Sequence, residues 1–280
     1  MGPLTSRAVA SVLAAAFVAA LLAACGDETD DAQTLSFTVT EQGKGSKIVG
    51  PQSAETGLAE ITLKNKNGKR EADLQLLRVE GDRSAEEVVE GLEKAMKGQP
   101  FPEWFFGGGG VGITEPGDSS TVTQVLEPGT YYAVDTEGQS PPDPKSLATI
   151  EVSGEASDEE LDADSTVSAF EYGFKADGLS SGKTEIAFEN SGAQPHHLLI
   201  SELTGDGTVE DVEQAFESEK GPPPLSEKNS QSTAVIEGGE TQLVTLDLKP
   251  GRYAMYCFIT DRQGGKPHAL KGMVDEVEVE

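Results

Sequence analysis

The feature that most constrains the fold is an internal repeat. The segment Ile-Thr-Leu-Lys-Asn at 61–65 recurs as Ile-Ala-Phe-Glu-Asn at 186–190, and Pro-Gly-Thr-Tyr-Tyr-Ala at 128–133 recurs as Pro-Gly-Arg-Tyr-Ala-Met at 250–255. Residues 74–77 and 84–87 recur at 198–200 and 208–211 with nearly the same offset. Because the repeated unit is as long as a complete domain, we interpret the chain as two copies of one module.

Two acidic stretches without aromatic residues, 26–34 and 153–166, bracket the repeats and have the composition of tethers and linkers. They predict these boundaries: a signal peptide over 1–24, an acidic tether over 25–34, a first block over 35–152, an acidic linker over 153–166 and a second block over 167–280.

Most segments within each block are short, alternating in polarity and rich in β-branched or aromatic residues, which predicts β-strands. Such segments lie at 61–63, 121–125, 131–134, 241–248 and 277–279. One helix is expected in each block, because Ser84 with Glu87 and Thr208 with Asp211 form capping boxes. The apolar positions expected to pack are Val88, Leu92 and Met96 in the first helix and Val209, Val212 and Phe216 in the second.

The N-terminal segment predicts export. An alanine-rich apolar run over 8–24 follows Arg7 and is too short to span a membrane. Its end, Leu-Ala-Ala-Cys at 22–25, resembles the bacterial lipobox, which implies a lipid on Cys25 and anchoring to the outer face of the bacterial cell membrane. The alternative is an ordinary secretory peptide followed by an incidental cysteine.

The charge balance argues against nucleic acid as a partner. The chain has 49 acidic and 21 basic residues and a formal net charge of −28, so a polyanion would be repelled. We interpret the acidic residues as solvating an exported protein, with a basic docking partner as the alternative.

Cysteine usage points to a metal. The chain has two cysteines, and with Cys25 assigned to lipid, Cys257 is left unpaired. In an oxidising compartment an unpaired thiol is retained mainly when it has a use. Metal ligation is one use, and inert burial is the alternative.

The second block carries three motifs in order. They are Asn-Ser-Gly-Ala-Gln-Pro-His-His at 190–197, Pro-Gly-Arg-Tyr-Ala-Met-Tyr-Cys at 250–257 and Pro-His-Ala-Leu-Lys-Gly-Met at 267–273. Together they resemble the cupredoxins, the plastocyanin and pseudoazurin family, over the whole block. The resemblance implies an all-β fold of two cupredoxin-like antiparallel Greek-key β-sandwiches in tandem, each with one inserted short helix.

The same resemblance implies one type 1 copper ion held by His196, Cys257, His268 and Met273. A thiolate and two imidazoles suit both oxidation states of copper, and a weak axial thioether tunes the potential. His197 is the alternative to His196, which we prefer because it directly follows the proline. All three histidines of the chain thus lie at or beside expected ligand positions.

Ten residues separate Cys257 from His268, a longer loop than in simple electron carriers of the family. This leaves the rigidity of the site open. Within the loop, Asp261 and Arg262 are interpreted as a local turn pair, with part of a partner surface as the alternative.

The first block contains no histidine and has Asp135 at the position of Cys257, so we expect it to bind no copper in this way. It has a segment over 102–110, expected to be a loop, in which Trp104, Phe105 and Phe106 precede four glycines. The aromatic residues predict a plug over the end of the sandwich, with an exposed contact patch as the alternative. The glycines permit positive φ and close backbone approach.

Three functions fit these observations. The first is a lipid-anchored carrier of single electrons, with an exposed imidazole edge and a redox partner protein. The others are copper capture or delivery, and a metal-free binding or structural module. A multicopper oxidase or nitrite reductase needs more histidines than the three present. No catalytic residue is expected, because neither a Ser/His/Asp constellation nor a phosphate-binding glycine motif is evident.

Overall fold

The computed structural model describes residues 32–43, 45–138, 140–218 and 221–280. The predicted signal peptide and Cys25 lie outside these residues. Within the described ranges, no helix has the length and apolar character required to cross a membrane.

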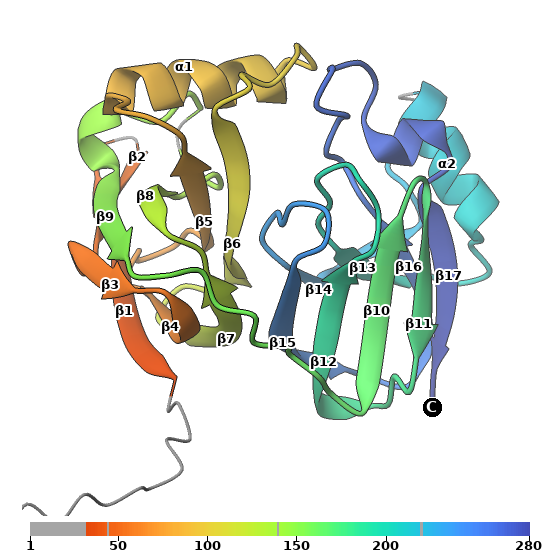
Figure 1. The fold of residues 1–280 in the computed structure, drawn as a ribbon. Helices are drawn as coiled ribbons and strands as arrows, with labels where there is room; N and C mark the ends of the chain where they lie inside the picture. Colours follow the sequence, from red (N-terminus) through yellow and green to blue (C-terminus); the bar gives the residue numbers. More distant parts are fainter. Residues whose placement is uncertain (1–31, 44, 139, 219–220) are drawn as a thin grey trace, which may run out of the picture. The chain divides into compact units, whose positions relative to one another are not determined.

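The two blocks share one order of elements, except that β3 of the first block has no counterpart in the second (Figure 1). The first block consists of β1 (Gln33–Gln42), β2 (Gly45–Val49), β3 (Ser53–Glu55), β4 (Gly57–Asn65), β5 (Ala72–Val79), α1 (Ala85–Met96), β6 (Phe105–Thr114), β7 (Ser119–Leu126), β8 (Gly129–Val134), the 3-10 helix η1 (Pro144–Ser146) and β9 (Ala148–Ser153). The second consists of β10 (Ser165–Phe170), β11 (Gly173–Asp177), β12 (Gly182–Asn190), β13 (Leu199–Leu203), α2 (Val209–Ser218), β14 (Leu225–Ser232), β15 (Thr241–Leu248), β16 (Gly251–Tyr256), the 3-10 helix η2 (His268–Lys271) and β17 (Val274–Val279).

One eight-stranded sheet runs through both blocks in the order β11-β10-β12-β15-β7-β4-β1-β2. A five-stranded sheet, β3-β9-β8-β5-β6, completes the first sandwich, and a four-stranded sheet, β14-β13-β16-β17, completes the second. The main core lies between the sheets and is continuous from Phe37 to Phe188. The predicted all-β fold of two cupredoxin-like sandwiches is confirmed, and the blocks are joined by the pairing of β7 with β15.

The sheets are mixed, whereas the sequence predicted antiparallel ones. Strand β1 pairs with β4 in parallel, and β10 pairs with β12 in parallel. Parallel neighbours need a crossover between them, which a hairpin cannot provide. Between β1 and β4 the chain makes that crossover through β3, which belongs to the five-stranded sheet.

Both predicted helix caps form. Ser84 Oγ accepts from the Glu87 N–H while the Glu87 carboxylate accepts from the Ser84 N–H, and Thr208 with Asp211 makes the same pair of bonds. The packing prediction is wrong for Met96, which is 54% exposed. Eight positions after Val88 a helix has turned about 80° away from its first apolar residue, so the stripe leaves the core there. The other five predicted positions, Val88, Leu92, Val209, Val212 and Phe216, pack in the clusters beneath the two helices.

The segments between the blocks differ slightly from the predicted boundaries. Strand β1 begins at Gln33, inside the predicted tether, and residues 154–164 form no helix or strand. This linker is held against the first block, because Glu159 Oε2 accepts from the Leu58 N–H at 2.9 Å and from Ser157 Oγ at 2.8 Å.

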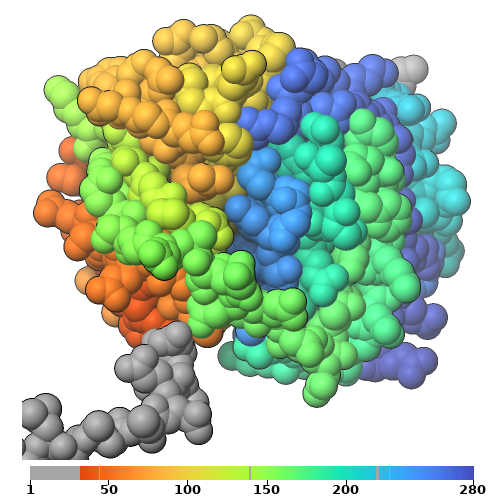
Figure 2. Space-filling model, viewed as in Figure 1, coloured from red at the N-terminus to blue at the C-terminus, as the bar shows by residue number. Residues whose placement is uncertain are grey.

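The glycine run lies in strand β6, which begins at Phe105, so the predicted loop over 102–110 is confined to 102–104. Glycine is normally disfavoured in strands, but here the second block lies against β6. A Cβ on Gly112 would lie 1.9 Å from the carbonyl oxygen of Ser232. The N–H of Gly109 donates to the Val235 carbonyl, and the backbone of Gly109 has a positive φ of 72°. In Figure 2 the segment before β15 lies between residues of the two blocks. Of the glycines for which close approach was predicted, Gly107 and Gly109 approach the second block, whereas Gly108 and Gly110 approach Tyr131 and the Leu74 carbonyl of the first block.

The aromatic residues before the glycines are packing residues. Phe105 is buried beneath α1, and Trp104 packs edge-on against it with 5.9 Å between ring centroids. Phe106 lies between the guanidinium groups of Arg78 and Arg262, at 4.9 and 4.7 Å. This agrees with the predicted plug for Trp104 and Phe105, whereas Phe106 belongs to the seam between the blocks.

Candidate metal centre

His196 is held by the turn that leads into β13. The Asn190 side chain donates to the carbonyl oxygens of Gln194 and Ile236 and accepts from the Gly192 N–H. His196 in turn exchanges two backbone hydrogen bonds of 3.0 Å with Ile236. The motif at 190–197 therefore fixes the position of this ring through its backbone.

Cys257 and His268 come from the two ends of one loop. Cys257 directly follows β16, and His268 is the first residue of η2. The loop is folded back on itself, because Ala269 donates to the Cys257 carbonyl at 2.7 Å and His268 donates to the Ile259 carbonyl at 2.8 Å. These two bonds bring residues that are eleven positions apart in sequence next to each other.

The donor atoms of the three side chains converge. His268 Nδ1 lies 3.0 Å from His196 Nδ1 and 3.7 Å from Cys257 Sγ, and the three donor atoms all lie within 4.8 Å of one another. Each of the three residues is 0% exposed. Among the described residues, this is the only group of three or more histidine, cysteine or acidic side chains so arranged.

Met273 closes the loop. Its N–H donates to the His268 carbonyl at 3.0 Å, and its side chain is buried in the main core cluster together with that of Cys257. The structure therefore places the last predicted ligand residue one position before β17, beside the loop that carries His268.

His197 has a different role from its neighbour. Its Nε2 accepts from the N–H of Phe258 at 3.0 Å, the residue after Cys257. The three converging donor atoms do not include one from His197. The structure thus places His196 at the centre and His197 as a support for the backbone next to Cys257.

A polar group covers the outer edge of His268. His268 Nε2 lies 3.1 Å from Asp261 Oδ1, and Asp261 also accepts from Tyr172 and Lys271. Burial alone would raise the pKa of Asp261, but the bonds from Lys271 and Tyr172 outweigh it and hold that pKa below its usual value. Lys271 also lies over the Tyr172 ring at 4.6 Å.

Glu171 lies beside the other histidine. Its Oε1 is 3.7 Å from His196 Nε2 and accepts from the N–H groups of Ala193 and Gln194. The carboxylate therefore fixes the turn that precedes His196 and places a negative charge near that ring.

Burial sets the protonation of the three converging groups. It raises the pKa of the Cys257 thiol to about 12, and together with the neighbouring His196 it lowers the pKa of His268 to about 4. Burial also lowers the pKa of His196. Without a cation the site at neutral pH holds a neutral thiol and neutral imidazoles, so a bound cation must displace the thiol proton.

The structure corrects two expectations about this end of the sandwich. Neither His196 nor His268 has an exposed edge, and Asp261, Tyr172 and Lys271 cover His268. Asp261 and Arg262 are not a local pair either. Asp261 contacts the residues over His268, whereas Arg262 points to the first block.

Arg262 ties the long loop to both blocks. Its guanidinium pairs with Glu237 at 3.0 Å and donates to the Phe105 carbonyl at 2.9 Å, and its own carbonyl accepts from the Phe101 N–H at 2.8 Å. A second link lies near the tip of the loop, where Gly265 donates to the Gly98 carbonyl. The first block therefore braces the loop whose rigidity the sequence left open.

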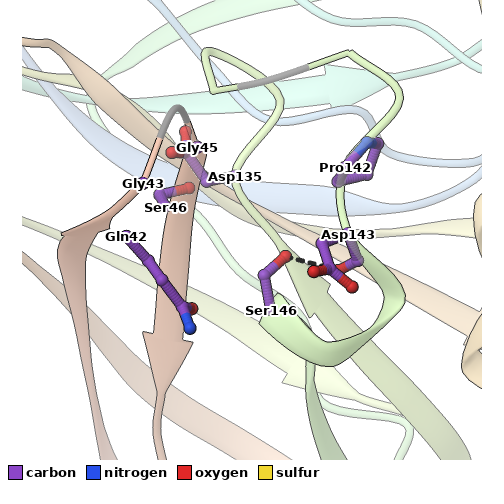
Figure 3. A pocket seen from close by; sticks show the side chains of 8 residues that line it. All are labelled: Gln42, Gly43, Gly45, Ser46, Asp135, Pro142, Asp143 and Ser146. Atoms are coloured by element: carbon purple, nitrogen blue, oxygen red, sulfur yellow. Dashed lines mark hydrogen bonds between the residues drawn. The ribbon is translucent and has the colours of Figure 1, made fainter.

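The first block has carboxylates at two positions that correspond to Cys257 and His197. Asp135 follows β8 as Cys257 follows β16. Asp73 accepts from the Thr136 N–H, as His197 accepts from the Phe258 N–H. Figure 3 shows the small cavity beside Asp135, of about 160 Å³, whose described lining includes Gln42, Ser46, Asp143 and Ser146 but no thiol or imidazole.

Sequence reasoning missed Glu171, Tyr172 and Lys271, and it assigned Asp261 the wrong contacts. No motif marks these residues, because they reach the histidines from the β10–β11 turn and from the loop around η2. The residues that contact the outer edge of a ligand are set by tertiary packing rather than by local pattern.

The donor set fits a type 1 copper ion. One thiol and two imidazoles at a buried end of a β-sandwich are the soft, trigonal ligands that both oxidation states of copper accept. The nearby carboxylate on His268 Nε2 is the kind of outer partner that orients a metal-binding imidazole. When bound, copper would supply a centre that gains and loses one electron.

Comparisons with known proteins give the following similarities. Residues 159–280 match the family of copper-binding proteins of the plastocyanin/azurin type. No curated protein matches the chain. Among solved structures, auracyanin from the photosynthetic bacterium Roseiflexus castenholzii is 18% identical over 44% of this chain and 98% of its own, with a TM-score of 0.31.

Two further solved structures are similar. Auracyanin A, a blue copper protein from the green thermophilic photosynthetic bacterium Chloroflexus aurantiacus, is 11% identical over 43% of this chain and 99% of its own, with a TM-score of 0.31. A blue copper oxidase from Nitrosomonas europaea is 12% identical over 89% of this chain and 86% of its own, with a TM-score of 0.25. From the family match over residues 159–280 and the copper-type donor set found there, we conclude that the second block belongs to the plastocyanin/azurin family of copper-binding proteins, the cupredoxins.

Proposed function

We propose that this protein carries single electrons on one copper ion at the outer face of the bacterial cell membrane, anchored by a lipid on Cys25. The proposed ligands are His196, Cys257 and His268, with Met273 as the weak axial ligand. The observation that carries the proposal is the convergence of the three donor atoms within 4.8 Å in a fully buried site. A rigid, buried ligand set favours electron transfer because little needs to move when the charge of the ion changes.

Electrons must enter by a route other than an exposed imidazole, since both ligand histidines are covered. Phe258 directly follows Cys257 and is 41% exposed. It packs against Tyr256 and Phe216, so an apolar surface lies one residue from the proposed thiolate ligand. We propose this surface as the place where a redox partner protein docks.

The test is a redox titration of the full chain loaded with one equivalent of copper. Electron transfer predicts a thiolate-to-copper absorption band that disappears and returns in a reversible one-electron step, with the copper retained throughout. Loss of copper to a Cu(I) chelator during reduction would instead support capture or delivery. No copper uptake at all would support a metal-free module.

An enzymatic role is the second candidate, because one similar structure bears the name blue copper oxidase. The three histidines of this chain are too few to hold the further copper ions that such oxidases use. We therefore propose an electron carrier and not an oxidase. Oxygen consumption by the copper-loaded chain with a chemical reductant would contradict this part of the proposal.

A further inference from the structure

A cavity of about 620 Å³ lies between the two blocks, beside the copper-binding loop. One wall comes from α1, strands β5 and β6 and the loop between α1 and β6, including Leu92, Phe101 and Phe105. The opposite wall comes from the segments next to the proposed ligands, including Phe258 and Ile259. The volume is within the range of pockets that hold small organic molecules.

Most polar groups that line this cavity are already engaged within the protein. The Gln75 amide bonds to the backbone of Val235 through both of its ends, and Thr233 both accepts from Leu198 and donates to Ala234. Asp73 accepts from Thr136. A ligand therefore meets mainly apolar and aromatic surface there.

His197 keeps one donor unused. Because its Nε2 accepts from the Phe258 N–H, the neutral ring must carry its proton on Nδ1. The described residues offer no hydrogen-bond partner to that Nδ1, and His197 lines the cavity. Thr260 also lines the cavity, but its unpartnered hydroxyl oxygen is covered by protein, so His197 Nδ1 is the donor that a ligand in the cavity can reach.

We propose that this cavity binds a small planar six-membered ring, aromatic or quinonoid, that carries a ring carbonyl or hydroxyl oxygen. The aromatic walls take the ring, and the oxygen accepts the hydrogen bond from His197 Nδ1–H. The bound molecule is then connected to the residue after Cys257 through one imidazole. The site goes beyond the proposed electron transfer, because its lining is protein alone and does not require copper.

The test is equilibrium dialysis of the copper-free full chain against duroquinone and against durene, which has the same methylated ring without the two oxygens. We expect duroquinone to bind at one molecule per chain and at least about threefold more tightly than durene, the difference made by one hydrogen bond. Equal binding of the two compounds, or no saturable binding of duroquinone, would overturn the proposal.

Two variants locate the binding site. Ala95 lines the cavity on α1, so Ala95→Phe should fill it and weaken duroquinone binding about tenfold or more. Ala215, half-buried on α2 and outside the cavity lining, provides the matched control Ala215→Phe, which should leave binding unchanged. Unchanged binding in folded Ala95→Phe would contradict the assignment.

A spectroscopic measurement is independent of these variants. In the copper-free protein, duroquinone should move the imidazole N–H resonance of His197 Nδ1 downfield, as a new hydrogen bond does, while durene, which offers no acceptor, should cause no comparable downfield shift. A bound duroquinone that leaves this resonance unshifted would refute the assigned hydrogen bond.

Discussion

At the scale of single residues, the site depends on side chains that touch the ligands from outside. Asp261 is the clearest case, because its carboxylate lies 3.1 Å from His268 Nε2. A negative charge there makes the imidazole more basic and favours Cu(II) over Cu(I). Asparagine could still accept a hydrogen bond at this position but would lack the charge.

We therefore expect Asp261→Asn to weaken Cu(II) binding about 10–100-fold and to raise the reduction potential. Competition with a Cu(II) chelator and a redox titration measure the two effects. Asp206→Asn, an exposed aspartate away from the site, is the control and should change neither. An unchanged affinity in Asp261→Asn would mean that the carboxylate has only a structural role.

Glu240 makes stability depend on pH. Burial, opposed in part by the N–H of Glu237, raises its pKa to about 7. Between about pH 4.3 and 7, the folded state therefore keeps a proton on Glu240 that the unfolded state has already released. The contribution of Glu240 to stability is therefore greatest below this window and falls as pH rises through it.

Glu240→Gln should remove this dependence, because the amide oxygen can still accept from Glu237 and no charge is buried. We expect the variant to unfold at higher denaturant than wild type at pH 8, by on the order of 1 kcal/mol, and to match it at pH 4. Urea titrations at the two pH values measure the difference. A variant less stable than wild type at pH 8 would contradict the assigned pKa.

At the scale of elements, β6 packs closely against the segment before β15 because glycines in β6 have no side chains. A Cβ on Gly112 would lie 1.9 Å from the Ser232 carbonyl oxygen, so Gly112→Ala must push the blocks apart. We expect a loss of about 1–3 kcal/mol in the free energy of unfolding. Gly68→Ala, where no atom lies within 4 Å of the new Cβ, should cost little. Equal stability of the two variants would argue against close packing at the seam.

Arg262 holds the long loop between Cys257 and His268 against the first block. Arg262→Gln loses the ion pair with Glu237 and the bonds to first-block carbonyls, while the ligands themselves are retained. We expect faster release of copper to a chelator, by about tenfold, because the loop between Cys257 and His268 can then open. Arg252→Gln, which removes a surface ion pair with Glu276, is the control. Identical release rates would show that the first block does not brace the site.

For the whole molecule, the sequence predicted what local pattern determines. The repeat, the two capped helices, most strands and the order of the copper motifs follow from residues that are close in sequence. The turn before His196 is an example, because Asn190 and its neighbours hold it through their own backbone.

Contacts between distant segments could not be predicted in this way. The pairing of β7 with β15 leaves no mark in either strand, since Val122 and Val244 would alternate in the same manner on an unpaired edge. The cover over His268 combines Tyr172 with Asp261, which are 89 positions apart. Glycines at 107–110 were expected to form a loop because the distant segments that require them in a strand, Val235 at Gly107 and the Leu74 carbonyl at Gly110, leave no local pattern.

The most direct test of the account is addition of Cu(II) to the purified full chain and to Cys257→Ser, with absorption and circular dichroism recorded together. We predict an intense blue thiolate-to-copper band that saturates at one equivalent in wild type and is absent in a serine variant with the same β-sheet spectrum. A blue band that persists in Cys257→Ser, or no blue band in folded wild type, would contradict the convergence of His196, Cys257 and His268 on one copper ion.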